Sequence, residues 1–285
     1  MSLDSNTHVG IAGAGTMGAG IAQVFLGAGF PVTLHDTSPR QLERAVAGIR
    51  DGLAKWENRK QIESAAAVLA RLTPAHDLMA LQGCAWIVEA IPERRAVKQE
   101  FFVALGVLAA PETILASNTS SISITSLGAY SGRPERTVGM HFFNPPTVMR
   151  LVEVVAGLRT DPQVVEATKQ LCERLGKVPI VAKDRPGFVS NRVLMPMINE
   201  AIWVLEEGVA NAEDVDQVMK LGMNHPMGPL ELADFIGLDV CLSILDVLHE
   251  ETGDPKFRPC PLLKKHVEAG WLGRKTGRGF FKYEP

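Results

Sequence analysis

A histidine and a glutamate on adjacent apolar segments are the residues of this sequence best suited to acid–base chemistry. Glu153 lies inside the apolar run 151–155, and His141 ends the run 137–141. An ionised carboxylate among aliphatic side chains is costly unless it is paired, so we predict that Glu153 pairs with His141 on a neighbouring strand. A carboxylate on one imidazole nitrogen fixes the tautomer and raises the basicity of the other nitrogen. His141 is therefore a candidate general base, and a structural ion pair of Glu153 with an arginine or lysine is the alternative.

Two further places carry polar side chains that could contact a reacting oxygen. Residues 117–121 read Ser-Asn-Thr-Ser-Ser after an apolar run, and Asn191 lies in the early turns of a predicted helix. Taken alone, the first is more typical of a polar turn or a helix cap, and the second is common in an exposed helical turn. Ligands of open α/β sheets bind beyond the carboxyl ends of the strands, so both places stay candidates.

A glycine-rich segment after the first predicted strand has the pattern of a phosphate-binding turn. Residues 13–18 read Gly-Ala-Gly-Thr-Met-Gly and open a helix. In such a turn Gly13 would permit the tight bend, Gly15 the approach of a pyrophosphate to the backbone, and Gly18 the close packing of helix on strand. The alternative is a turn whose glycines serve packing only.

The end of the second predicted strand carries a carboxylate that favours one cofactor. Asp36 lies 18 residues after Gly18. Its side chain could accept hydrogen bonds from a ribose 2′-hydroxyl and would repel a 2′-phosphate. The motif therefore predicts NAD rather than NADP, although Arg40 is a nearby cation that argues the other way.

The elements that must position these residues alternate between short strands and longer helices in the first half of the chain. The patterns predict strands over 9–12, 31–35, 84–89, 113–116, 137–141, 151–155 and 178–181, and helices over 19–28, 41–72 and 164–175. Continuous apolar strands that alternate with helices are typical of a parallel sheet covered on both faces.

The pattern changes after residues 183–187, and the rest of the chain is mostly helical. We expect a long helix over 189–206, a helix capped by Asn211, further helices over 229–234 and 240–250, and one strand over 279–283. The predicted organisation is an α/β domain over residues 1–185 and a helical domain over 186–285.

Composition excludes several classes of function. The 285 residues carry a net charge of −3, so no strong field attracts nucleic acid, and no apolar run approaches the length of a membrane helix. The first seven residues lack the apolar core of a secretion signal. Cys84, Cys172, Cys241 and Cys260 have no paired spacing, which predicts free thiols in a reducing cytoplasm and no metal site or disulfide framework.

Together these motifs resemble the short-chain L-3-hydroxyacyl-CoA dehydrogenases, including the bacterial 3-hydroxybutyryl-CoA dehydrogenases, over nearly the whole chain. The matching segments are residues 13–18, 89–91, 117–121, 141–145, 151–155, 186–192, 226–229 and 275–277. The resemblance implies a Rossmann-like α/β domain with a mostly parallel sheet and an all-α domain that binds substrate and forms a homodimer. It also implies NAD as cofactor and an acyl-CoA as substrate.

The resemblance further assigns roles to individual residues. His141 and Glu153 are implied as the catalytic pair, with Ser120 and Asn191 contacting the reacting oxygen of the substrate or the nicotinamide region. The positions implied for NAD binding are Gly13, Gly15, Thr16, Met17, Gly18, Asp36, Glu93, Lys98, Ser120, Asn144 and Lys275. In the implied reaction, His141 takes the proton of the 3-hydroxyl group while C3 gives a hydride to NAD⁺.

One departure from the family concerns the CoA part of the substrate. On the helix after Asp36, relatives present a serine and a lysine to the acyl-CoA, where this sequence has Gly52 and Arg59. Arg59 and Lys60 are expected to meet a CoA phosphate, whereas the hydroxyl contact at position 52 is lost.

Two other functions share part of the pattern. A dehydrogenase of a free 3-hydroxy acid would use the same glycine-rich turn but would not need Arg59 and Lys60. A non-catalytic NAD-binding or structural protein would not need the four catalytic candidates together.

Overall fold

Two compact units make up the chain in the computed structural model, which describes residues 7–284. One unit extends to Arg185 and the other begins at Pro186. The first six residues, for which no secretion signal is predicted, lie outside the described residues, as does residue 285.

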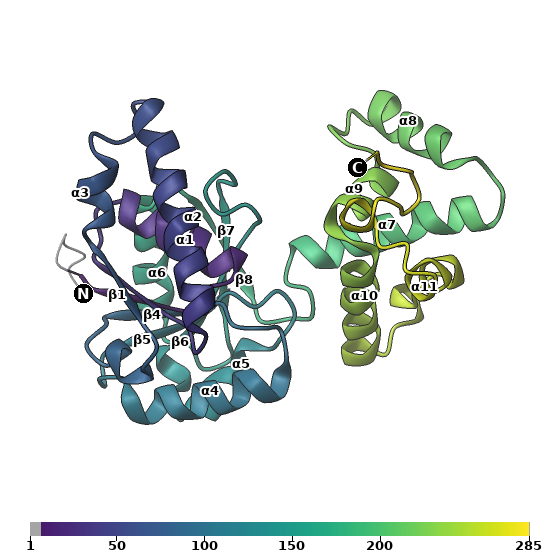
Figure 1. Ribbon diagram of the computed structural model, residues 1–285. Coiled ribbons are helices and arrows are strands. Elements are labelled where there is room, and N and C mark those ends of the chain that lie inside the picture. Colours follow the sequence, from purple (N-terminus) through teal and green to yellow (C-terminus); the bar gives the residue numbers. More distant parts are fainter. Residues whose placement is uncertain (1–6, 285) are drawn as a thin grey trace. The chain divides into compact units, whose positions relative to one another are not determined.

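The first unit is built on one sheet of eight strands, in the order β3-β2-β1-β4-β5-β6-β7-β8. Figure 1 shows the strands of this unit lying among its helices. The strands are β1 Val9–Ala12, β2 Val32–His35, β3 Leu72–Ala75, β4 Trp86–Glu89, β5 Ile114–Ser117, β6 Thr137–Phe142, β7 Leu151–Ala156 and β8 Val178–Lys183. All neighbouring strands pair in parallel except β6 and β7, which are antiparallel. The predicted mostly parallel sheet is therefore confirmed, and its β6–β7 pair follows from a return of only eight residues, too short for a parallel crossover.

Helices cover both faces of this sheet. On one face, alternate strand residues share a core with α1 (Thr16–Gly27), α2 (Pro39–Asn58) and α6 (Pro162–Arg174). On the other face lie α4 (Arg95–Leu108) and α5 (Ile124–Ser131), which approach so closely that a Cβ on Gly106 would meet the carbonyl of Ser131 at 1.9 Å. Because side chains alternate between faces along a strand, the strand residues between the core positions, His141 and Glu153 among them, face α4 and α5.

The helix predicted over 41–72 is wrong in its second half. The helix α2 ends at Asn58, and Lys60 adopts a left-handed φ of 57° that ends the helical path. A short helix α3 (Ala65–Leu69) and the edge strand β3 follow, with two 3₁₀ turns later in the unit, Leu78–Leu81 and Pro134–Arg136.

The second unit is helical, as predicted. It contains α7 Ser190–Glu206, α8 Ala212–Gly222, α9 Pro229–Ile236, α10 Leu238–Thr252 and α11 Pro261–Glu268, with 3₁₀ turns at Pro255–Phe257 and Arg274–Thr276. Asn211 caps α8 by accepting from the Asp214 N–H at 2.8 Å, as its position predicts.

The strand predicted over 279–283 is wrong. Only isolated bridges join Gly273 to Arg278 and Arg278 to Lys282 in the described part of this unit. The backbone N–H groups of Phe280 and Phe281 donate to the carboxylate of Asp234, at 3.0 and 2.9 Å, in place of a neighbouring strand. The side chain of Asp234, on α9, therefore provides the hydrogen-bond acceptors that a neighbouring strand would otherwise offer to these two N–H groups.

All four cysteines are free and buried. Burial raises the pKa of the Cys84, Cys172 and Cys241 thiols to about 12, so none of these three is activated as a nucleophile at neutral pH. Within residues 7–284, every helix falls short of the length and apolar character needed to cross a membrane.

Candidate active site

The predicted pairing of His141 with Glu153 is present in the structure. The two residues lie directly opposite each other in the antiparallel β6–β7 pair, and Nδ1 of His141 is 2.8 Å from Oε2 of Glu153. Only 8% of His141 and 1% of Glu153 is exposed. A carboxylate held on Nδ1 favours the tautomer in which Nε2 carries the lone pair, which is the form that a general base requires.

The glycine-rich turn between β1 and α1 has the shape that a pyrophosphate needs. Gly13 has a φ of +98°, and a Cβ there would lie 2.5 Å from the carbonyl oxygen of Ala90. A Cβ on Gly18 would lie 1.7 Å from the carbonyl oxygen of Gly13, whereas around Gly15 nothing lies within 4 Å of the added atom. No side chain caps the first turn of α1, which begins at Thr16 and Met17. The open backbone at the helix N-terminus therefore fits an anion.

Asp36 follows β2 and is tied to the glycine-rich turn. One carboxylate oxygen accepts from the Ala14 N–H and the other from the Ser38 N–H, both at 2.8 Å. Each carboxylate oxygen has a second acceptor position, so these bonds leave Asp36 able to accept from the hydroxyl groups of a ribose.

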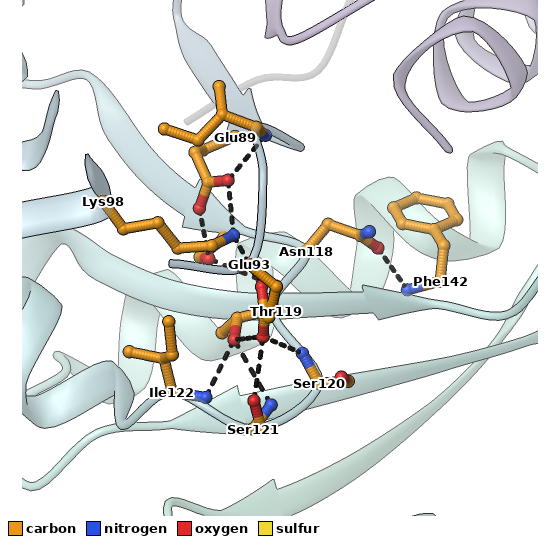
Figure 2. A network of polar contacts seen from close by, with 11 residues as sticks. Glu89, Glu93, Lys98, Asn118, Thr119, Ser120, Ser121, Ile122 and Phe142 are labelled. Atoms are coloured by element: carbon orange, nitrogen blue, oxygen red, sulfur yellow. Dashed lines mark hydrogen bonds and ion pairs between the residues drawn. The ribbon is translucent and has the colours of Figure 1, made fainter. Parts of the chain in front are cut away.

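Past the ends of β4 and β5, Glu93 gathers the hydroxyl-rich turn (Figure 2). Its Oε1 accepts from the hydroxyl of Thr119, from the Ser120 N–H at 3.2 Å and from the Ser121 hydroxyl at 3.0 Å. Burial alone would raise the pKa of Glu93, but the Lys98 ammonium and these donors outweigh burial and lower it. Glu93 is therefore a carboxylate at neutral pH, and Ser120 is held by its backbone.

Lys98 is connected to the hydroxyl-rich turn through its ion pair with Glu93. Its side chain is only 1% exposed, and its ammonium lies 2.6 Å from Glu89 and 2.9 Å from Glu93. Burial opposes the charge on Lys98, but the two carboxylates prevail and raise its pKa. A direct contact of Lys98 with a cofactor stays a prediction.

Asn144, the remaining cofactor candidate of this unit, lies in the exposed segment that follows β6. Two residues of the region lie in segments named from the sequence, 117–121 and 89–91, but were given no role of their own there. Asn118 accepts from the Phe142 N–H at 2.8 Å and thereby joins the ends of β5 and β6. Glu89 is a fully buried carboxylate at the end of β4, where a charged residue closing an apolar strand was the same signal that Glu153 gave.

Arg59 and Lys60 lie at the C-terminal end of α2 and are exposed. One turn earlier, Trp56 lines a cavity of about 460 Å³ together with three cations, Arg150, Arg174 and Lys177. The described residues that line it include no carboxylate. This region therefore suits an anionic ligand with a planar group.

The space beside Gly52, where relatives have a serine, is occupied by the side chain of Gln23. A Cβ on Gly52 would lie 2.3 Å from the side-chain oxygen of Gln23, a buried residue of α1. The glycine therefore leaves room for the Gln23 amide on the side of α2 that faces α1.

The second unit holds the other two candidates. Asn191 lies in the first turn of α7 and is 8% exposed. Lys275 donates to both carboxylate oxygens of Asp239, at 2.5 and 2.7 Å. Their contacts with substrate and cofactor stay predictions.

Comparison with protein families gives two matches that together span nearly the whole chain. Residues 8–185 match the family described as 3-hydroxyacyl-CoA dehydrogenase, NAD binding domain. Residues 187–283 match the 3-hydroxyacyl-CoA dehydrogenase, C-terminal domain.

Individual relatives agree with these matches. The chain is 52% identical to a probable 3-hydroxybutyryl-CoA dehydrogenase of Bacillus subtilis over 276 residues, which is 96% of each chain. It is also 52% identical to a 3-hydroxybutyryl-CoA dehydrogenase of Bradyrhizobium diazoefficiens, covering 96% of this chain and 94% of the relative. A crystal structure of (S)-3-hydroxybutyryl-CoA dehydrogenase from Ralstonia eutropha matches with a TM-score of 0.95 and 45% identity, over 98% of this chain and 100% of the other.

Proposed function

The chain belongs to the 3-hydroxyacyl-CoA dehydrogenase family, and from this premise we propose that it interconverts (3S)-3-hydroxyacyl-CoA and 3-oxoacyl-CoA by hydride transfer to and from NAD. It is an NAD-dependent oxidoreductase that acts on a CH–OH group. Relatives named for 3-hydroxybutyryl-CoA support a short acyl chain, with acetoacetyl-CoA as the oxidised substrate. The observation that carries the proposal is the buried His141–Glu153 pair, with 2.8 Å between Nδ1 and Oε2.

The residues of the first unit fit NAD. The backbone around Gly15 is open at the N-terminus of α1, where a pyrophosphate would be held. Asp36 would accept from the adenosine ribose, and Glu93, Ser120 and Asn144 are proposed for the nicotinamide half. When bound, NAD supplies or accepts the hydride.

We expect Asp36→Ala to narrow the preference for NAD over NADP by about tenfold or more in kcat/KM, because it removes both the ribose acceptor and the charge that repels a 2′-phosphate. Steady-state rates with the two cofactors measure the ratio. Asp36→Asn is the matched control, since it keeps an acceptor for the Ala14 or Ser38 N–H. An unchanged ratio in both variants would show that Asp36 does not contact the ribose.

His141 moves the proton in the proposed mechanism. During oxidation, Nε2 takes the proton of the substrate 3-hydroxyl as the hydride leaves C3, and during reduction the imidazolium returns it to the forming alkoxide. Glu153 stabilises the imidazolium through Nδ1 and keeps the ring in one orientation. General acid–base catalysis of this kind contributes about 10²–10⁴-fold.

Ser120 and Asn191 are proposed to donate hydrogen bonds to the substrate oxygen on which charge develops. Donors aimed at such an oxygen are worth roughly 3–4 kcal/mol each in comparable sites. The backbone of Ser120 is anchored by Glu93, so the serine would present its hydroxyl group from a fixed backbone position.

The CoA phosphates are proposed to bind at the end of α2. Arg59 and Lys60 are exposed there, and the cavity beside Trp56 adds Arg150 and further cations. Exposed cations of this kind bind a phosphate mainly by charge. The CoA part would thereby contribute to KM and little to the chemical step.

The activity test compares three oxidised substrates. The protein should oxidise NADH with acetoacetyl-CoA and, at a higher KM, with acetoacetyl-N-acetylcysteamine, which has the thioester but no phosphate. It should be inactive with free acetoacetate. Turnover of acetoacetate at a rate equal to that of acetoacetyl-CoA would instead identify a dehydrogenase of free 3-hydroxy acids.

The double variant Arg59→Gln/Lys60→Gln is the matching test of the phosphate site. We expect it to raise the KM for acetoacetyl-CoA about tenfold and to leave kcat within about twofold. The KM for the N-acetylcysteamine thioester should not change. Lys264→Gln/Lys265→Gln, two exposed neighbours on α11, removes the same charge and is the control. Equal effects of both double variants would rule out a specific phosphate contact.

We also propose that the second unit binds substrate and forms a homodimer. Its helix α8 and the residue that follows it expose apolar side chains, with Val218 61%, Leu221 82% and Met223 62% exposed. Large exposed apolar side chains that gather on one element are typical of an interface. Sedimentation should show a dimer, and Leu221→Glu should shift it toward the monomer. An unchanged dimer in that variant would place the interface elsewhere.

The proposed location is the cytoplasm. The four buried free thiols suit a reducing compartment.

A further inference from the structure

Glu89 is a buried carboxylate to which the proposed reaction gives no task. It is fully inaccessible to solvent and makes three contacts with donors. Its Oε1 accepts from the Ile91 N–H at 2.8 Å and from the Lys98 ammonium at 2.6 Å, and its Oε2 accepts from the Ser117 hydroxyl at 2.6 Å. Burial raises the pKa of Glu89 even with Lys98 beside it. Burial of a carboxylate costs free energy unless the carboxylate is paired and hydrogen-bonded, as Glu89 is by these three donors.

The contacts of Glu89 lead to the hydroxyl-rich turn by two separate routes, and Figure 2 labels the residues of the second, Glu89, Lys98 and Glu93. On the first route, the Ser117 hydroxyl that donates to Glu89 accepts from the Thr119 N–H at 3.2 Å. On the second, Lys98 joins Glu89 to Glu93, whose other oxygen holds the turn. Both routes therefore end on residues 119–121.

The sheet register places Glu89 in the same layer as the catalytic candidates. Glu89 pairs with Ser117, and Ser117 pairs with Gly139 two residues before His141. Side chains at these positions and at His141 face the same side of the sheet, because alternate residues of a strand share a face. Glu89 is thus linked to the carboxyl-end edge where ligands of such sheets bind.

Lys98 alone would not hold the turn in this way. If Glu93 were the only carboxylate partner of the Lys98 ammonium, the ammonium would have no anchor in the sheet. The Lys98–Glu93 pair could then shift as a unit. With Glu89 as a second partner, the Lys98 ammonium is held between two carboxylates, 2.6 Å from Glu89 and 2.9 Å from Glu93. Glu93 then has a defined place from which it holds the backbone of Ser120.

We propose that Glu89 is a positioning residue of the active site, which acts through Ser117 and through Lys98–Glu93 to hold the turn that carries Ser120. The inference rests on the proposed function, in which Ser120 contacts the reacting oxygen. A role in fold stability alone is the competing explanation.

The test is a double-mutant cycle of Glu89→Gln and Ser120→Ala, read as kcat with acetoacetyl-CoA and NADH. Glu89→Gln should lower kcat about tenfold or more in the wild-type background. In the Ser120→Ala background it should lower kcat by much less, because the side chain that it positions is already absent. Equal losses in both backgrounds, or an unchanged kcat in the single variant, would overturn the proposal.

A matched control separates positioning from stability. Asp216→Asn replaces another buried carboxylate, which holds the Leu230 and Glu231 N–H groups of α9. It should lower the melting temperature without changing kcat. If Glu89→Gln does not fold, Ser117→Ala breaks one of the two routes by removing a single oxygen, and the same cycle with Ser120→Ala then decides the question by the same criterion.

The outcome is also separable from the proposed function. If the wild-type protein does not turn over acetoacetyl-CoA, the function fails, and NADH binding measured by fluorescence without substrate still tests Glu89. In that case a Glu89→Gln protein that binds NADH about threefold or more weakly supports the positioning role, and wild-type affinity overturns it.

Discussion

Replacing His141 by glutamine is expected to lower kcat by at least about 100-fold, because glutamine fills a similar volume but can neither take nor return a proton at neutral pH. NADH affinity should stay within about twofold of wild type, since the contacts proposed for the pyrophosphate and the adenosine ribose are made by the glycine-rich turn and by Asp36, which follow β1 and β2 and not β6. Initial rates with acetoacetyl-CoA measure the first effect, and NADH fluorescence titration measures the second.

His8→Gln is the control for this variant. His8 is a partly buried histidine of the same unit whose Nε2 contacts the Thr33 hydroxyl at 2.9 Å. It directly precedes β1 and so lies at the edge of the sheet opposite the ends that carry the candidate site. Normal turnover is expected there. Normal turnover in His141→Gln would remove the proposed base and would favour a non-catalytic NAD-binding protein.

Local patterns were sufficient to predict most of the sheet, and the errors have identifiable causes. The strand β3 is an edge strand whose central residues Thr73 and Pro74 are exposed, so it lacks the apolar run that marked the others. The predicted helix continued past Asn58 because residues 55–60 are mostly charged and contain neither glycine nor proline. The chain leaves the helical path because Lys60 adopts a left-handed φ, and no residue type in this segment predicts that conformation.

Non-local contacts explain what was not predicted about the candidate site. Glu153 could be paired with His141 from the sequence because a charge in an apolar strand requires a partner and a neighbouring strand supplied one. The same reasoning applies to Glu89, but its partners Lys98 and Ser117 lie on a helix and on another strand, and no spacing along the chain connects the three. The false strand at 279–283 has the same origin, because its backbone is satisfied by Asp234.

Replacing Glu153 by glutamine is expected to lower kcat by at least about 100-fold, even though the side chain keeps its shape. In one orientation the amide oxygen still accepts from Nδ1 but no longer offsets the charge of the imidazolium. In the other orientation the amide N–H donates to Nδ1 and holds the proton on Nε2, which is the tautomer that cannot act as a base. Changes of this kind in comparable carboxylate–histidine pairs cost up to about 10⁴-fold.

The double variant His141→Gln/Glu153→Gln distinguishes this role from a structural one. If Glu153 acts only through His141, the double variant should be no slower than His141→Gln alone, because the second change removes nothing that is still in use. Losses that multiply would instead show that Glu153 supports the site by another route, such as a structural ion pair. Glu135→Gln, which breaks an exposed ion pair with Arg159 on the same unit, is the control for loss of one charge, and its kcat should stay within about twofold of wild type.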